Sequence, residues 1–315
     1  MTISELGQAI TTQVSRVIQG QEQTVEHLLV CLLARGHVLL EGVPGLAKTL
    51  LAKCLAHTLG GEFKRVQFTP DLMPSDVTGT NVFDPGSAQF HLRRGPVFTD
   101  LLLADEVNRT PPKTQSALLE AMEERSVTID GISHALPHGF FVIATQNPIE
   151  HEGTYPLPEA QLDRFLMKSV LDYPTLEQER DVLRLHDRGM DPHDIVAAGV
   201  EQVAQLADLQ AAQASVRDIK VRDEVLDYIL HVVRRTRQIP QVIVGGSPRA
   251  AVALMACSKV TAALRGRDFV TPDDVRDVTL PVLRHRLILQ PEAELEQLTA
   301  DRILNSVLAA VEVPR

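Results

Sequence analysis

The sequence predicts a three-layer α/β domain built on a parallel sheet, followed by a smaller all-helical domain. Three observations carry this prediction. An apolar run, His37 to Leu40, is followed by the loop GVPGLAKT and then by a helical segment. Further strand-like and helical segments alternate along the chain, as in parallel α/β folds. After Tyr173-Pro174 only helical spacing continues. We therefore expect one domain over 1–173 and a second over 174–315.

Each element of the first domain has a local signal. Helices at 4–18 and 22–35 precede the first strand, and the helix after the loop ends near Gly60-Gly61. Another helix follows Pro111-Pro112, because proline is tolerated in a first turn. The strands are expected at 37–41, 63–69, 101–105, 126–130, 133–137, 140–145 and 166–171.

Two connecting segments of the first domain have features of their own: a predicted hairpin turn and a long insertion. Asp130-Gly131 stands between two alternating runs and predicts a hairpin. Residues 70–95 contain Pro, Gly, Asp and Ser throughout and are too long for a plain connection. We expect an irregular, elaborated insertion there.

In the second domain, apolar spacing predicts helices at 176–188, 200–214, 222–237, 248–265 and 272–285. Thr175 with Gln178, and Thr271 with Asp274, have the spacing of N-capping pairs. No strand-like alternation recurs in this half of the chain.

Composition narrows the classes of protein. Hydrophobic residues make up 44% of the 315 residues and charged residues 23%, as in a folded globular chain. The formal net charge of −10 disfavours a dedicated nucleic-acid binder. The cysteines Cys31, Cys54 and Cys257 lie far apart and suggest reduced core residues. We expect a cytoplasmic protein, since neither a signal peptide nor a membrane-spanning run is evident.

The loop at 42–49 suits phosphate binding. Its residues are Gly42, Val43, Pro44, Gly45, Leu46, Ala47, Lys48 and Thr49, and Leu50 continues into the helix. In such a loop backbone N–H groups wrap phosphates at a helix N-terminus. Lys48 would reach the terminal phosphates, and Thr49 would offer its hydroxyl to Mg²⁺. Ala47 stands where the generic pattern has glycine.

Two acidic residues end a later strand. Asp105 can hold Mg²⁺ through water, and Glu106 can polarise an attacking water. Acidic residues also cap buried strands on leaving a core, but a position one strand-and-helix repeat after a phosphate loop favours the catalytic interpretation.

Three further polar residues belong to the candidate site. Asn147 ends the strand beside the acidic pair and could hydrogen-bond the γ-phosphate and the attacking water, although Asn before Pro is also a common turn. Arg164 could be an arginine finger for a neighbouring subunit, or only a partner of Asp163. Arg249 falls in a first helical turn, where a cation opposes the helix dipole. A ligand anion nearby would explain it, and a solvated surface arginine stays possible.

Together the motifs resemble the MoxR family of AAA+ ATPases, which are P-loop NTPases. They are GVPGLAKT, LLLADEVNRTPPKTQSALLEAMEE, FVIATQNPIE, LPEAQLDRF and GGSPRA, in the family's order and over about residues 5 to 310. The run from Asp105 to Glu124 is the most specific. The family tolerates alanine at the position of Ala47.

The resemblance implies a role for each motif: Walker A for Lys48 and Thr49, Walker B for Asp105 and Glu106, sensor 1 for Asn147, a trans-acting finger for Arg164, and sensor 2 for Arg249 on the helical lid. It implies ATP and Mg²⁺ as cofactors, with ATP between the α/β domain and the lid. Asn108 and Arg109 match the family without an evident role. Residues 70–96 would be the helix-2 insertion, and 126–137 the hairpin before sensor 1.

The implied function is ATP hydrolysis by a homo-oligomeric, hexameric ring that remodels, matures or activates a protein client. Losing the finger would lower turnover by about 10³–10⁵-fold. Family members often act with von Willebrand factor A domain partners. An alternative is a nucleic-acid motor or loader that grips DNA with the hairpin, but its tip, Asp130-Gly131, has only His134 nearby as a potential cation. A third possibility is a scaffold that binds ATP without appreciable turnover.

Overall fold

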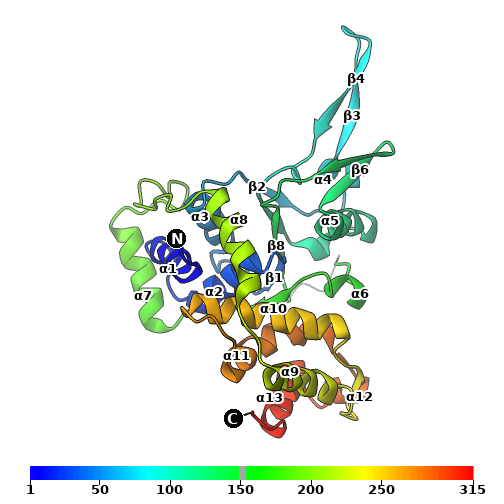
Figure 1. Ribbon diagram of the computed structural model, residues 1–315. Helices are drawn as coiled ribbons and strands as arrows, with labels where there is room; N and C mark the ends of the chain where they lie inside the picture. Colours follow the sequence, from blue (N-terminus) through cyan, green and yellow to red (C-terminus); the bar gives the residue numbers. More distant parts are fainter. Residues whose placement is uncertain (149–153, 315) are drawn as a thin grey trace.

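A five-stranded sheet lies at the centre of the computed structural model, which describes residues 1–148 and 154–314 (Figure 1). Its strand order is β2-β5-β8-β1-β9, and all of these pairings are parallel. The strands are β1 (Val38–Glu41), β2 (Phe63–Gln67), β5 (Leu101–Asp105), β8 (Phe141–Gln146) and β9 (Met167–Val170). The predicted parallel α/β sheet is confirmed.

The two faces of the sheet belong to two hydrophobic clusters, because successive side chains of a strand point in opposite directions. Leu101 and Leu103 of β5 pack with the cluster that contains the helices α1 (Ile3–Val14), α2 (Glu22–Leu33) and α3 (Lys48–Thr58). Leu102 and Ala104 pack with the cluster that contains α5 (Pro112–Glu124). Helices therefore cover both faces and make three layers.

The segment 70–95 is more regular than we expected. It contains the short helix α4 (Pro74–Thr78) and an antiparallel hairpin of β3 (Gly79–Asp84) and β4 (Gln89–Arg94), which projects from the molecule (Figure 1). The Asp84 carboxylate closes its turn by accepting hydrogen bonds from the Gly86 N–H and the Ser87 hydroxyl. The prediction of an irregular segment was wrong. The many turn-forming residues concealed the short alternating runs of β3 and β4 on either side of the turn.

A second hairpin, β6 (Ser126–Ile129) and β7 (Ile132–Ala135), lies beside the first. Asp130 and Gly131 both have positive φ, 49° and 80°, as a tight two-residue turn requires. Asn81 of the first hairpin donates to the Asp130 carboxylate over 2.7 Å. The predicted hairpin is confirmed, and the two hairpins touch at this point.

The rest of the chain is mainly helical. It contains α7 (Leu176–Asp187), α8 (Leu206–Ser215), α9 (Asp223–Thr236), α10 (Pro248–Leu264), α11 (Pro272–Leu283), α12 (Pro291–Leu295) and α13 (Ala300–Ala310). Capping boxes begin α7 and α11, as Thr175 and Thr271 predicted. The expectation of a wholly helical domain was wrong, because β10 (Val242–Val244) pairs with β11 (Ile288–Leu289). Such two- and three-residue strands are too short to show alternation.

Helices of the second half pack directly on the first. Helix α10 contacts α1 and α2, and α11 contacts β9. After α11, the buried Arg286 donates to the Asp163 carboxylate over 2.7 Å and to the Phe165 carbonyl over 2.8 Å. Arg286 therefore links the helical part, by hydrogen bonds, to the segment that contains Arg164. The division at residue 173 stays a prediction.

The three cysteines are buried and unpaired, as we expected. Burial raises the pKa of Cys54 and of Cys257 to about 12, so neither is a reactive thiolate at neutral pH. Among the helices of the described residues, none combines the length and the apolarity needed to cross a membrane.

Candidate functional site

The phosphate loop joins the end of β1 to the start of α3. Its backbone is left-handed at Gly45, where φ is 92°, and at Ala47, where φ is 54°. Ala47 is the N-cap of α3, and its methyl group cannot accept a hydrogen bond from the first helical N–H groups. These donors and the positive end of the helix dipole favour an anion at the loop.

Lys48 is held inside this loop. Its ammonium group donates to the Gly42 carbonyl over 2.5 Å. Partial burial lowers the Lys48 pKa, while the carboxylates of Asp105, Glu106 and Glu41 act in the opposite direction. The cation therefore lies close to the acidic pair and in position to neutralise a bound phosphate.

The acidic pair lies at the carboxyl end of β5. Asp105 ends the strand, and Glu106 has left-handed backbone with a φ of 58°, which turns the chain into the short helix η1 (Val107–Arg109). On the neighbouring strand β8, the Thr145 hydroxyl donates to Asp105 Oδ1 over 2.6 Å and accepts from the Glu106 N–H over 2.9 Å. Thr145 is fully buried and fixes the position of both acidic residues.

Three further side chains contact the acidic pair, and we had not expected any of them there. Arg65 donates to Asp105 Oδ2 from Nε over 3.2 Å and from Nη2 over 2.8 Å. Gln67 donates to Glu106 Oε2 over 2.6 Å, and Arg109 Nε lies 3.2 Å from the same oxygen. Residues 65 and 67 share one face of β2, which pairs with β5. Their two-residue spacing was the signal that could have revealed them.

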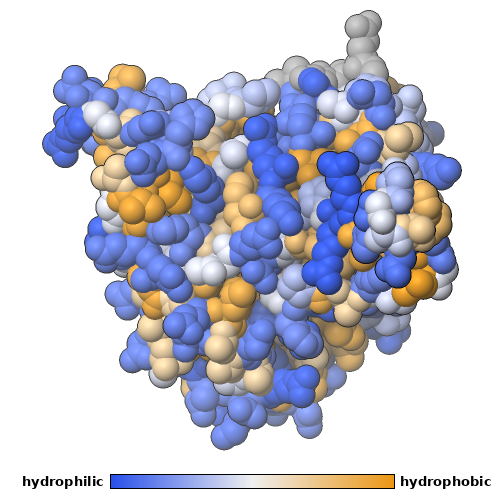
Figure 2. Space-filling view, turned by 90° about the horizontal axis from the view of Figure 1, so that it is seen from above, coloured by the Kyte–Doolittle hydropathy of each residue, from blue (hydrophilic) through white to orange (hydrophobic). Residues whose placement is uncertain are grey.

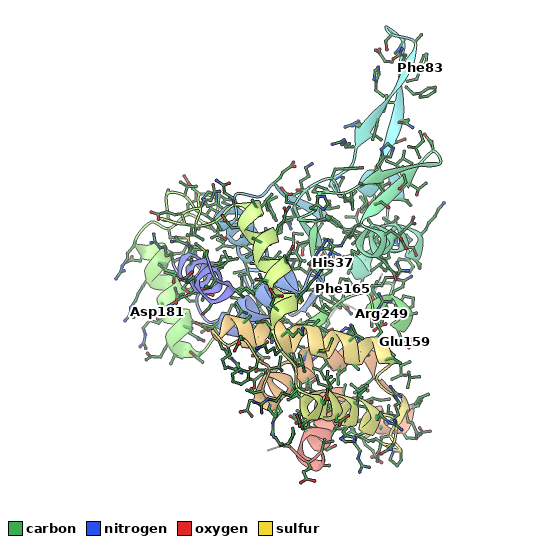
Figure 3. All side chains as sticks on the ribbon, in the orientation of Figure 1. His37, Phe83, Glu159, Phe165, Asp181 and Arg249 are labelled. Carbon is green, nitrogen blue, oxygen red and sulfur yellow. The ribbon has the colours of Figure 1, made fainter. Side chains whose placement is uncertain are left out.

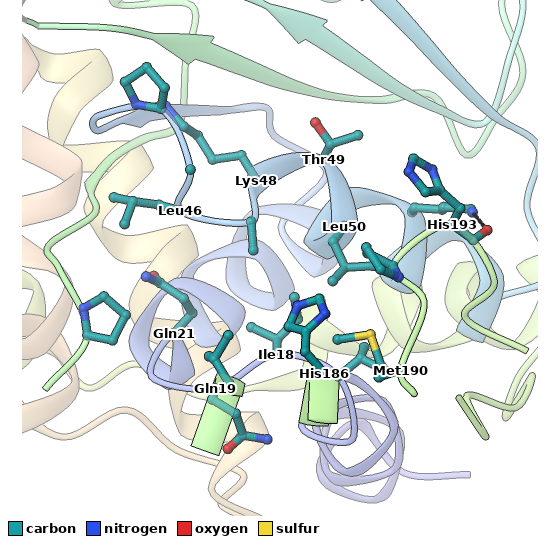
Figure 4. A pocket seen from close by; sticks show the side chains of 18 of the residues that line it. Ile18, Gln19, Gln21, Leu46, Lys48, Thr49, Leu50, His186, Met190 and His193 are labelled. Atoms are coloured by element: carbon teal, nitrogen blue, oxygen red, sulfur yellow. Dashed lines mark hydrogen bonds between the residues drawn. The ribbon is translucent and has the colours of Figure 1, made fainter. Parts of the chain in front are cut away.

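A cavity of about 930 Å³ brings most of the predicted site together (Figure 4). Lys48, Thr49, Asp105, Glu106 and Asn147 all line it. The other loop residues that line it are Pro44, Gly45, Leu46, Ala47 and Leu50. Gly42 and Val43, also predicted to bind the nucleotide, are not among its lining residues.

The opposite wall of the cavity comes from two segments that the sequence did not link to the site. One is the turn between α1 and α2, with Ile18 and Gln21; the other is α7 and its following loop, with His186 and Met190 (Figure 4). We had interpreted the first only as a turn between helices. Apolar groups on this wall offer contact area for a flat ring next to the phosphate loop.

Arg249 does not reach this cavity. It lies in the first turn of α10, and Figure 3 places it on the opposite side of the molecule from Asp181 of α7. The structure does not bring Arg249 to the cavity of its own chain, where we expected the lid to supply it. The reason is packing: α10 contacts α1 and α2, and α7 lines the wall of the cavity opposite the phosphate loop.

Arg249 and Arg164 meet at one carboxylate of α5. Arg164 Nε lies 3.0 Å from Glu123 Oε2, and Arg249 Nη2 lies 3.4 Å from Glu123 Oε1. Asp163 contacts Arg249 Nε at 3.7 Å and pairs with Arg286, rather than with its neighbour Arg164. The arginine side chains are 30% exposed at Arg164 and 54% at Arg249. Two accessible guanidinium groups therefore converge on a face remote from the cavity.

The sequence is similar to families and proteins already described. Residues 37–167 match the model of the ATPase family associated with various cellular activities (AAA), and residues 234–307 match the AAA lid domain. The protein YeaC of Bacillus subtilis is 47% identical over 98% of this chain and 95% of its own length. Chaperone MoxR1 of Mycobacterium tuberculosis is 45% identical over 96% of this chain and 81% of its own.

The fold is also similar to a solved structure. The crystal structure of a Cytophaga hutchinsonii protein described as an ATPase superposes with a TM-score of 0.90 at 38% identity. The match covers 99% of this chain and 96% of that one. The likeness therefore extends to both the sheet and the helical part.

Proposed function

Because the chain belongs to the MoxR family of AAA+ ATPases, we propose that it forms a ring that uses ATP to remodel a protein client. As a member of this family it hydrolyses ATP to ADP and phosphate. The family also assembles into oligomers. The client, the ring and the roles of single residues are the parts that we propose.

The donor set at the phosphate loop fits Mg²⁺ and a nucleoside triphosphate. Thr49 offers a hydroxyl and Asp105 a carboxylate, and Mg²⁺ prefers oxygen ligands and keeps several waters. Across residues 1–148 and 154–314, no group of three or more His, Cys, Asp or Glu could hold a metal alone. We therefore assign Mg²⁺ to Thr49 and Asp105, where it would screen the phosphate charge.

Each group of residues around the cavity then has its own role in hydrolysis. Glu106 orients the attacking water and accepts its proton, and Asn147 contacts the water or the γ-phosphate without adding charge. Lys48 and the N–H groups of the loop stabilise negative charge on the phosphates. The backbone of Pro44–Leu50 holds the phosphate chain, and the wall with Ile18 and Met190 contacts the base.

The convergence of Arg164 and Arg249 on Glu123 is the main observation in support of a ring-shaped oligomer. Two arginines brought together on an accessible face, on the side opposite α7, are suited to a triphosphate held by another copy. A contact between opposite sides of identical subunits is head-to-tail, and it closes into a ring where the rotation from one subunit to the next closes. We propose that both arginines act in trans. Six subunits is the number that the family implies.

Mixing two inactive variants tests this arrangement. Glu106→Gln disables a protomer's own site but keeps its arginines, whereas Arg164→Ala keeps the site and removes the finger. In random rings at a one-to-one ratio, about a quarter of the sites combine an intact Glu106 with a neighbour's intact Arg164. Phosphate release should reappear on mixing. If the mixture stays inactive while light scattering shows mixed oligomers, Arg164 does not act in trans.

A protein client is favoured by the projecting hairpins. Phe83, Phe90 and Ile132 are 49%, 70% and 60% exposed, and the rings of Phe83 and Phe90 are 5.2 Å apart. Seen from above, hydrophobic residues are interspersed with hydrophilic ones on this side of the molecule (Figure 2). We propose that these side chains contact apolar segments of the client.

The nucleic-acid alternative makes a different prediction for the same hairpins. Arg93 and Arg94 pair with Thr80 and Gly79 at the base of the first hairpin, so neither lies near its tip. A single-stranded DNA motor would bind an oligonucleotide tightly, and more weakly as salt rises. Fluorescence anisotropy at low salt tests this, and tight, salt-sensitive binding would overturn the protein-client proposal.

The chaperone role rests on Chaperone MoxR1, which the chain resembles over most of its length. The family further suggests a von Willebrand factor A domain protein as a partner. Three buried, unpaired thiols agree with the reducing cytoplasm, where we place the protein. Turnover in the presence of reduced casein should exceed turnover without it, and equal rates would contradict a chaperone that responds to unfolded chains.

A further inference from the structure

Arg65 is a cation that the proposed hydrolysis does not use, although it lines the same cavity as Lys48. It lies on β2, which is an edge strand of the sheet and leads into the insertion at 70–96. Its guanidinium group donates twice to one oxygen of Asp105. We propose that Arg65 opposes Mg²⁺ at Asp105 and so sets the Mg²⁺ concentration at which nucleotide binds tightly.

The hydrogen bonds of Asp105 explain why the two cations compete. Oδ1 accepts the Thr145 hydroxyl, and Oδ2 accepts Nε and Nη2 of Arg65. A carboxylate oxygen has two lone pairs, so both sites of Oδ2 are taken by Arg65, whereas Oδ1 keeps one beside the Thr145 hydroxyl. To receive a water of the Mg²⁺ shell at Oδ2, Asp105 must release at least one Arg65 bond. A guanidinium group next to a dication is also repelled by it.

The exposure of the pair makes this exchange feasible. The Arg65 side chain is 47% exposed and that of Asp105 is 14% exposed. Because an ion pair with one solvated partner is weak, Arg65 can leave without unfolding its strand. The pairing therefore tunes Mg²⁺ binding and does not block it.

The same arginine connects the magnesium residue to the catalytic one. Arg65 Nη2 also donates to Gln67 Oε1 over 2.9 Å, which directs the amide nitrogen of Gln67 toward Glu106. Because Nη2 is shared between Asp105 and Gln67, moving Arg65 away from Asp105 also disturbs the bond that orients the Gln67 amide. Mg²⁺ binding would then loosen the hold of Gln67 on Glu106. Arg65 is thus a positioning residue for both acids.

The proposal is tested by binding rather than by turnover. The probe is mant-ADP, titrated onto the full chain in excess EDTA and at graded free Mg²⁺. We expect Arg65→Gln to lower the free Mg²⁺ concentration at half-maximal effect by about tenfold. The mant-ADP affinity in EDTA should change by less than about twofold, because Arg65 contacts Asp105 and not the phosphate loop. Arg65→Lys keeps the charge but loses the paired donation, so its midpoint should lie between those of wild type and Arg65→Gln.

Arg217→Gln is the matched control, since it removes the same charge from an exposed position outside the cavity. It should leave the Mg²⁺ midpoint unchanged. A midpoint in Arg65→Gln equal to wild type would overturn the proposal. So would a large loss of mant-ADP affinity in EDTA, which would make Arg65 a phosphate ligand. A lysine variant that behaves like the glutamine variant would show that charge is not the cause.

This inference rests on the proposed role of Asp105 in holding Mg²⁺, and the titration separates the two. If Mg²⁺ does not affect mant-ADP binding to the wild type, the magnesium assignment fails. If Mg²⁺ strengthens binding to the wild type and to Arg65→Gln at the same midpoint, the assignment stands and only the role of Arg65 fails.

Discussion

At the scale of single residues, the positions of Asp105 and Glu106 are set by hydrogen bonds from neighbouring side chains. Thr145 joins the side chain of Asp105 to the backbone of Glu106. A fully buried hydroxyl that both donates and accepts satisfies two polar groups at once. Thr145 lies on β8, which pairs with β5, so the spacing of these two strands determines where the two acidic groups lie.

Thr145→Val should therefore lower turnover more than it lowers nucleotide affinity. Valine has the same shape but leaves the Glu106 N–H without its partner and costs about 1–3 kcal/mol of stability. We expect a fall in kcat of roughly 10- to 100-fold, from misplacement of the acids. Steady-state phosphate release and mant-ADP titration measure the two effects. Thr145→Ser, which keeps the hydroxyl, should retain most activity, and equal losses in both variants would contradict this role.

At the scale of elements, the first hairpin depends on its glycines. Gly79 has a φ of 100°, and a Cβ there would lie 2.4 Å from the Arg93 carbonyl oxygen and 2.6 Å from the Gly95 nitrogen. Only glycine allows the two strands to meet so closely at the base. The hairpin thus starts from a closely packed base and projects away from the sheet, and its exposed aromatic pair lies near the turn.

The exposed pair leads to a prediction about client response. Phe83→Ala combined with Phe90→Ala should reduce the ratio of casein-stimulated to basal turnover by at least about threefold. The reason is loss of apolar contact area at the client. Ile243→Ala removes a similarly exposed apolar side chain from the helical part and serves as the control. An unchanged ratio in the double variant would remove the hairpin from client contact.

At the scale of the whole molecule, buried histidines make stability depend on pH. His37 lies between β1, β8 and α5: its Nδ1 accepts from the Val142 N–H at 3.0 Å, and its Nε2 lies 3.1 Å from the Met122 carbonyl. His27 pairs with Ser169 at 2.8 Å, which joins α2 to β9. Burial, with a smaller contribution from nearby arginines, lowers the pKa of each to about 4.

Stability should fall as pH drops below about 6.5. The unfolded histidines titrate near 6.5 and the folded ones near 4, so the unfolded state binds more protons between these values. Each histidine should cost roughly 2 kcal/mol between pH 7 and pH 5. Urea unfolding at both pH values measures this loss. His27→Asn should reduce the pH dependence, and an unchanged slope would contradict the assignment.

Local patterns were sufficient for much of this protein. The loop at 42–49, the buried strand that ends in Asp105 and the hairpin turn at Asp130-Gly131 are contiguous, so periodicity and turn chemistry revealed them. The acids and the loop also converge as expected, because parallel strands end at one edge of the sheet. The hairpin of β3 and β4 was missed, since its turn residues dominate a short alternation.

The sequence by itself determined the sheet, the phosphate loop and the chemical types of residue at the site. Only the tertiary structure decided which residues face one another. Glu123 and Arg249 are 126 residues apart, and Arg65 and Asp105 are 40 apart. Contacts of this kind depend on how α10 packs on α1 and α2 and on how β2 pairs with β5. Side-chain periodicity within one element carries no information about the element that it will meet, so packing alone places these charges.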